Sequence, residues 1–145
     1  MPSFVHTTVR SPCIGEARVK RIVEAVLRHL SHSHASVAVH FVGLRRMQRL
    51  NRVYRGLDRP TDVLSFSLRE GDRAGKALGA EEWGDVFLCV PYLTKQARRF
   101  GVSYEEECIR MLIHGLLHLA GFDHDTRGRA KKMFQHQERL LSRIL

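Results

Sequence analysis

Apolar side chains recur along the first half of the chain in two alternating spacings. Between residues 16 and 30 they return every three or four positions with basic residues between them, which predicts an amphipathic helix. Residues 35–42 are rich in β-branched side chains at alternating positions, which predicts a half-buried strand. Residues 44–55 return to the helical spacing, which places these apolar side chains on one side of a helix: Leu44, Met47, Leu50 and Tyr54.

The second half contains shorter strands and a long apolar helix. Further strands are predicted at 4–9, 61–68 and 83–90, with a glycine-rich polar loop over 69–82. Pro91 opens a helix that ends at Gly101, and a last amphipathic helix covers 127–145. Strands mixed with helices in this order indicate an α+β fold, with a small mixed sheet packed with about five helices.

The most apolar helix is predicted between residues 103 and 120. Ser103 followed by Glu106 is a capping-box pattern, and the acidic residues behind it suit the positive end of a helix dipole. The residues that follow are apolar on nearly every face, so we expect this helix at the centre of the molecule.

Composition places the chain among globular proteins. It has 145 residues, of which 43% are hydrophobic and 27% charged, so we expect one domain over 1–145. It contains no run of eighteen apolar residues, and residues 1–10 lack the apolar stretch of a secretory signal. We therefore expect a cytoplasmic protein with no membrane partner. Cys13, Cys89 and Cys108 are an odd, widely spaced set, which favours reduced thiols over disulfides.

The charge balance favours an anionic partner. Lysine and arginine number 24 against 15 acidic residues, a net charge of +9. Such an imbalance is typical of proteins that bind nucleic acid or ribosomes, although many basic proteins bind neither. Arginine outnumbers lysine, and its planar guanidinium group suits the recognition of phosphate.

Three histidines in the run H-G-L-L-H-L-A-G-F-D-H, residues 114–124, form the strongest chemical signal. His114 and His118 are four residues apart, which places both imidazoles on one face of the apolar helix. Gly121 ends that helix, and a short turn brings His124 back toward the same point. Three neutral imidazoles leave the fourth tetrahedral position of a zinc ion open, as in catalytic rather than structural sites.

Chance alone explains a pair of histidines four apart in a chain with nine, but not the third at this offset. Two polar rings on a buried helix also need a partner, and a metal ion supplies one to both. Asp123 and Asp125 flank His124, and either is a candidate acceptor for a ring N–H. Nickel and copper suit three imidazoles as well as zinc does. The other histidines are predicted to be ordinary surface residues or to lack ligand spacing: His6, His29, His32, His34, His40 and His136.

The histidine spacing also matches the metzincin zinc proteases, H-E-x-x-H-x-x-G-x-x-H, with one exception. Gly115 stands where those proteases carry the glutamate that acts as general base, and no acid follows Glu107 on this helix. A peptidase would lack its proton acceptor, so we do not predict one. The proton acceptor is then a metal-bound hydroxide, the substrate phosphate or an acid elsewhere in the chain.

An arginine-rich segment precedes the histidines. Gly56 and Pro60 predict a fixed turn between the helix at 44–55 and the next strand. Solvation explains the arginines of the helix, Arg45, Arg49 and Arg52, but explains less well why Arg55 and Arg59 bracket a rigid turn. Arg55 lies near the border of the apolar face and can point into a cleft.

The segment N-R-V-Y-R-G-L-D-R-P-T-D-V-L-S-F at 51–66, Gly84-Asp85 and the histidine run together resemble the YbeY family of metal-dependent endoribonucleases. The resemblance covers residues 41–141. It implies zinc ligands at His114, His118 and His124, and an essential arginine at Arg55. It also implies cleavage of single-stranded RNA, maturation of the 3′ end of small-subunit rRNA and a role in ribosome quality control. Ser67 departs from the family, whose members often carry proline there.

The sequence thus predicts a zinc-dependent endoribonuclease, with Arg55 holding the scissile phosphate and the helix arginines forming a track for the RNA backbone. The nucleophile stays open between a zinc-bound hydroxide and the ribose 2′-OH. Two alternatives remain: a ribosome-assembly factor whose zinc is structural, and a zinc hydrolase of peptides or esters, against which Gly115 argues.

Overall fold

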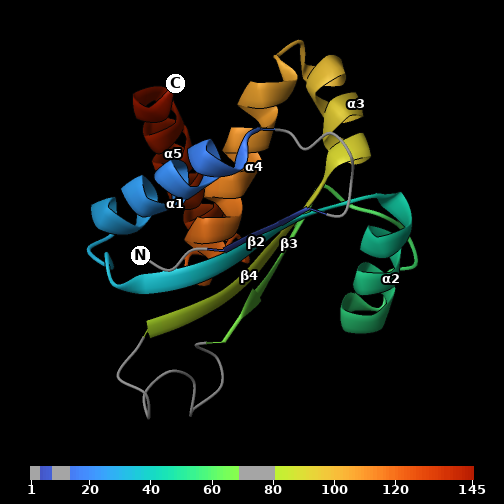
Figure 1. The fold of residues 1–145 in the computed structure, drawn as a ribbon, viewed down its shortest axis with the longest axis horizontal. Coiled ribbons are helices and arrows are strands. Elements are labelled where there is room, and N and C mark those ends of the chain that lie inside the picture. Colours follow the sequence, from blue (N-terminus) through green and yellow to red (C-terminus); the bar gives the residue numbers. More distant parts are fainter. Residues whose placement is uncertain (1–3, 8–13, 69–80) are drawn as a thin grey trace.

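A computed structural model describes residues 4–7, 14–68 and 81–145, which form a four-stranded sheet with helices on both sides (Figure 1). The elements follow in this order: β1 (Phe4–Thr7), α1 (Glu16–His29), β2 (Ala35–Val42), α2 (Leu44–Arg55), β3 (Val63–Ser67), β4 (Glu81–Cys89), α3 (Val90–Phe100), α4 (Tyr104–Leu119) and α5 (Arg127–Ile144). The expected α+β fold, with a small mixed sheet and five helices in the described part, is confirmed. None of these helices is long and apolar enough to cross a membrane.

The sheet has the strand order β1-β2-β4-β3. Strands β1, β2 and β4 run parallel, and β3 runs antiparallel to β4 at one edge. Helices α1, α4 and α5 lie on one side of the sheet, whereas α2 lies on the other (Figure 1). Because β3 is an edge strand, no other strand of the described sheet pairs with its outer edge, which leaves that edge to line a cleft.

The predicted boundaries match at β2 and α2 and shift by a few residues elsewhere. The strand expected to end at Val90 ends at Cys89, since Pro91 lies in the first turn of α3 and fixes a backbone angle suited to a helix start. The capping box is confirmed, because the Ser103 hydroxyl accepts from the Glu106 backbone N–H at 3.0 Å. Of the predicted loop at 69–82, residues 69–80 lie outside the described residues, as do 8 and 9 of the first strand.

Helix α4 lies in the main core, as expected from its apolar sequence. Its inward side chains are fully buried against α1, α5 and the sheet, among them Leu112, Ile113 and Leu116. A smaller cluster on the other side of the sheet packs under α2: Val42, Met47, Leu64, Phe87 and Cys89. Cys89 and Cys108 are buried thiols, as predicted, and Cys13 lies outside the described residues. The central helix is therefore held rigidly from several sides, which fixes whatever it carries.

Strand β4 contains a β-bulge next to Gly84, where its pairing with β2 shifts by one residue. Ser36 of β2 pairs with Glu82 while its neighbour Val37 pairs with Gly84, so Trp83 is an extra residue in β4. Trp83 and Val86 consequently both point into the main core, although they are three positions apart, an offset that puts side chains on opposite faces of a regular strand. Gly84 has φ of +133°, a backbone conformation that side chains with a Cβ rarely adopt.

We expect Gly84→Ala to destabilise the protein by about 3 kcal/mol or more, because a Cβ there lies 2.0 Å from the Phe66 backbone oxygen. Urea unfolding followed by circular dichroism measures the change. Gly128→Ala is the matched control, since its Cβ meets nothing within 4 Å. Equal stability of the two variants would contradict this account of β4.

Candidate metal centre

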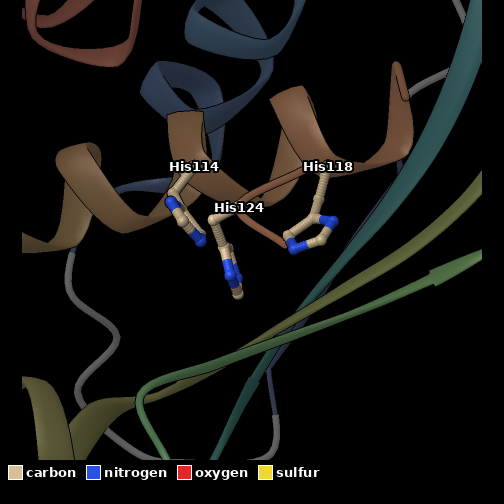
Figure 2. A group of neighbouring side chains, drawn as sticks. All are labelled: His114, His118 and His124. Atoms are coloured by element: carbon tan, nitrogen blue, oxygen red, sulfur yellow. The ribbon is translucent and has the colours of Figure 1, made fainter. Parts of the chain in front are cut away.

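The three predicted ligands come together at the carboxyl end of α4. His114 and His118 lie one turn apart on the helix, which ends at Leu119. Gly121, with φ of +103°, reverses the chain, and the Phe122 N–H donates to the Leu117 carbonyl across the turn. His124 then faces the two helical histidines (Figure 2). The local sequence therefore builds the site almost by itself.

The donor set fits a single metal ion. One nitrogen from each ring lies within 4.8 Å of the others, and the ring centroids are 5.3 to 6.1 Å apart. Two nitrogens bound to one tetrahedral zinc ion are about 3.4 Å apart, a spacing that small ring rotations reach from here. His114 and His118 are half-buried and His124 is exposed, so the site opens toward solvent on one side.

Gln137 of α5 orients the first ligand. The His114 Nδ1 and the Gln137 Oε1 lie 2.8 Å apart. An amide oxygen only accepts, so Nδ1 carries the proton and Nε2 keeps its lone pair for a metal ion. Gln137 is itself buried, so this tautomer is held by a fixed partner. Such orienting contacts are typical of histidines that bind metals.

His118 is kept in its neutral form. Burial lowers its pKa most, and the nearby His114 and His124 lower it further. Asp123 opposes them, and Arg55 adds a still smaller decrease. A neutral imidazole offers a lone pair, which is the state that a metal ligand requires. The electrostatics of the cluster thus favour metal binding over protonation at this ring.

The flanking aspartates do not take the role expected of them. The Asp123 carboxylate accepts from the His124 backbone N–H at 2.7 Å, and Asp125 pairs with Arg129 at 3.3 Å. Both contacts stabilise the turn and the start of α5 rather than a histidine ring. Among the hydrogen bonds described, the ring acceptor is therefore not one of these aspartates but Gln137, which pairs with His114 from 23 residues further along the chain.

A chain of polar side chains continues from Gln137 into the core. Gln137 donates to Glu138, which accepts from Arg110 at 2.9 Å, and Arg110 in turn donates to Glu107 at 2.8 Å. The hydrogen bonds to Glu138 raise the pKa of Arg110 further above its usual range, so its charge is permanent. This network anchors the orienting amide from behind.

We expect Gln137→Met to lower the metal affinity by about 10- to 100-fold, because it removes the acceptor while keeping similar volume. Gln137→Glu retains an acceptor oxygen and should keep most of the affinity. Competition with a chromophoric zinc chelator measures both variants. Unchanged affinity in Gln137→Met would show that His114 needs no orienting partner.

The histidines line a cleft of about 700 Å³, together with the end of α2 and the edge strand β3. Tyr54 and Arg55 come from α2, whereas residues 61–66 form the wall contributed by β3 and the turn before it. Arg55 is exposed and lies close enough to His118 to affect its pKa. The structure thus places Arg55 beside the three histidines, as the sequence suggested from the border of the apolar face.

The turn between Arg55 and Arg59 is fixed by a buried asparagine. Asn51 is 1% exposed, and its Nδ2 donates to the Arg59 backbone oxygen at 2.8 Å. Gly56 caps α2 in the left-handed conformation, with φ of 73°. Both arginines therefore project from a rigid support.

Gly115 has a structural reason to be glycine. A Cβ at this position would lie 2.8 Å from Val86 Cγ1 and 3.0 Å from Ser65 Oγ, because α4 packs its backbone directly on β3 and β4. The Ser65 hydroxyl also donates to the Gly115 carbonyl at 3.1 Å. The glutamate of the zinc proteases has no room here, which agrees with the absence of a peptidase base. The carboxylates that do line the cleft are Asp62 and Asp123.

Histidines outside the metal centre take specific contacts. His40 hydrogen-bonds Asp85 at 2.8 Å, and the His32 ring packs against Trp83 with centroids 5.0 Å apart. The arginines proposed as an RNA track are exposed: Arg45, Arg49, Arg52 and Arg59. The sequence did not single out Arg46, whose guanidinium lies over the Phe87 ring.

Comparison with known proteins matches the chain to one family over nearly its whole length. The family model described as "Endoribonuclease YbeY" matches residues 8–145. A protein named endoribonuclease YbeY from Persephonella marina is 39% identical over 127 residues, covering 87% of this chain and 81% of the relative. One from Sulfurihydrogenibium, with the same name, is 34% identical over 142 residues, covering 97% and 91%.

A solved structure shares the fold. The solution structure of a Thermotoga maritima protein superposes with a TM-score of 0.67 at 28% identity, covering 98% of this chain and 88% of that one. Fold and sequence therefore agree, and the chain belongs to the YbeY family.

Proposed function

We propose that this protein is a metal-dependent endoribonuclease that cleaves single-stranded RNA and matures the 3′ end of small-subunit rRNA. One observation carries the proposal: three converging imidazoles and an exposed arginine share one cleft in a chain whose relatives are named endoribonucleases. The proposal extends to a role in ribosome quality control and to the cytoplasm, where ribosomal RNA is processed.

The residues of the cleft divide the work between them. His114, His118 and His124 would hold the ion, for which we favour zinc because all three donors are imidazoles. A bound zinc ion supplies Lewis-acid activation of water and of the scissile phosphate. Arg55 binds the phosphate through its planar fork of N–H donors and neutralises the charge that develops in the transition state.

The remaining arginines contribute to RNA binding, before the cleavage step. Helix α2 carries five arginines and no acidic residue, and the arginines that we assign to the track lie at its exposed surface: Arg45, Arg49, Arg52 and, beyond the helix, Arg59. Such a surface attracts any phosphate backbone independently of its sequence, and the affinity should fall as salt rises. It explains how RNA reaches the cleft, whereas the cleft determines what happens there.

The direct test is cleavage of single- and double-stranded RNA by zinc-loaded and by chelated protein. We expect the loaded protein to cut the single strand, the chelated protein to lose nearly all activity, and added zinc to restore it. The end groups of the product identify the nucleophile, since a cyclic phosphate indicates the ribose 2′-OH. Activity that survives chelation would belong to a contaminating nuclease and would overturn the mechanism.

A variant of the same test separates an enzyme from an assembly factor with a structural metal. If a folded His118→Ala variant supports rRNA processing as well as the unmodified protein, the metal has no catalytic part. Loss of processing with intact folding supports the nuclease.

A further inference from the structure

Tyr54 lines the cleft and is largely exposed to solvent. Its position in the sequence follows the apolar spacing of α2, together with Met47, which is fully buried. Tyr54 is nevertheless 65% exposed, and it lines the cleft beside Arg55 and the three histidines. An aromatic ring that the fold leaves open beside a proposed reaction centre is suited to contact a ligand rather than the core.

The ring is supported from behind by other aromatic side chains. Tyr54 meets Phe66 of β3 with centroids 4.9 Å apart, and Phe66 meets the largely buried Phe87 at 5.6 Å. Phe87 stacks on His40 at 4.2 Å with the two ring planes 9° apart. This row of rings runs from the cleft into the smaller core cluster under α2. Phe66 is therefore a packed partner that limits the movement of the Tyr54 ring.

The surroundings select the chemistry of a ligand for this ring. Arg55, the next residue, presents a guanidinium to the same cleft. Helix α2 carries no acidic residue, and the two carboxylates of the cleft, Asp62 and Asp123, come from other segments. A ligand that satisfies both neighbours has a flat aromatic face joined to a phosphate. A nucleotide unit of an RNA strand has both parts.

We propose that Tyr54, supported by Phe66, stacks on an unpaired nucleobase next to the phosphate held by Arg55, and that this contact makes the cleft select single-stranded RNA. The inference rests on the function proposed above and assigns its specificity to a named residue. In a duplex the faces of each base are covered by its neighbours, so a paired base reaches Tyr54 only after unstacking. An unpaired base has a free face and meets no such barrier.

Binding of a fluorescent RNA tests the contact without cleavage. The probe is a short oligouridine with a single 2-aminopurine, titrated with chelated protein so that the strand stays intact. We expect its fluorescence to be quenched on binding. Tyr54→Ala should remove most of the quenching and weaken binding by about ten- to a hundredfold, whereas Tyr54→Phe, which keeps the ring, should bind nearly normally.

Phe100→Ala is the matched control, because Phe100 is a similarly exposed aromatic residue at the end of α3 that does not line the cleft. It should leave quenching and affinity unchanged. Unchanged quenching in Tyr54→Ala would overturn the proposal, as would equal losses in the two alanine variants.

Cleavage by the zinc-loaded protein tests the specificity. Tyr54→Ala should raise KM for the single strand more than it lowers kcat, and should reduce the preference for single-stranded over duplex RNA. If the protein binds the probe through Tyr54 but cuts no RNA, the proposed reaction fails and the stacking contact stands. If cleavage depends on metal and Arg55 while Tyr54→Ala keeps the strand preference, the stacking proposal alone fails.

Discussion

Arg55→Ala should reduce kcat for RNA cleavage by about 10²- to 10³-fold, which is the usual loss when a donor to the developing transition-state charge is removed. Arg55 is exposed at the end of α2, so the variant should fold and unfold like the unmodified protein. Its zinc affinity should also persist, because the three histidines and Gln137 are untouched. Single-turnover kinetics with saturating enzyme measure the chemical step directly.

Two further variants separate the role of Arg55 from mere positive charge. Arg55→Lys keeps the charge but loses the planar fork of donors, so we expect partial activity. Arg52→Ala removes an exposed arginine of the same helix, which pairs with Asp58 at 3.7 Å and lies outside the cleft lining. It should weaken RNA binding and lower the salt dependence while leaving kcat nearly unchanged. A similar kcat in Arg55→Ala and Arg52→Ala would remove Arg55 from the reaction.

The ligands could be predicted from the sequence because their geometry is local. His114 and His118 share a helix face by spacing alone, and Gly121 marks the turn that returns His124. The apolar periodicity likewise predicted β2 and α2 with their observed bounds. In each case the determining interactions join residues a few positions apart, so a single sequence contains them.

The partners of these ligands could not be predicted, because they meet only through tertiary packing. Gln137 reaches His114 after α5 packs on α4, and the sole trace in the sequence is a glutamine among the buried positions of α5. For Tyr54 the sequence pattern is misleading, since its helical spacing indicates burial whereas the fold leaves the residue exposed. Strand order is non-local as well: β4 lies between β2 and β3, which no local pattern specifies.

Gly115 excludes one kind of active site and helps to form another. The sequence shows that a protease glutamate is missing from this position, and the structure shows why, since Val86 and Ser65 fill the space that its side chain needs. The close contact of α4 with β3 that excludes the glutamate also brings the histidines to the edge of β3, where the cleft forms. Tight packing at Gly115 thus excludes the glutamate of a zinc protease and brings the three histidines to the cleft.

Arg110→Ala should be among the most destabilising single changes in the described part of the chain, lowering the free energy of unfolding by about 3–5 kcal/mol. Arg110 holds three carboxylates together: Glu106, Glu107 and Glu138. Glu107 is 1% exposed, and without Arg110 its buried charge keeps only the Gln96 N–H, at 2.6 Å, of the contacts described. Urea unfolding of metal-free protein isolates this effect from metal binding.

The control for Arg110 is an arginine pair at the surface. Arg129 and Asp125 are both exposed, so Arg129→Ala should cost no more than about 1 kcal/mol. Adding Glu107→Gln to Arg110→Ala should restore part of the stability, because a buried amide needs no opposite charge. If Arg110→Ala proves as mild as Arg129→Ala, the network is not a support of the fold.

Acid should diminish the contribution of Arg110. Burial alone would raise the pKa of Glu138, but hydrogen bonds from Arg110 and Gln137 outweigh it and lower that pKa below 4.5. A carboxyl group with a lowered folded-state pKa stabilises the protein above its unfolded pKa, and this stabilisation is lost as pH falls through the folded value. The difference between the unmodified protein and Arg110→Ala should therefore be full at pH 7 and shrink below pH 4.5, whereas a difference independent of pH would mean that Arg110 acts through packing rather than through charge.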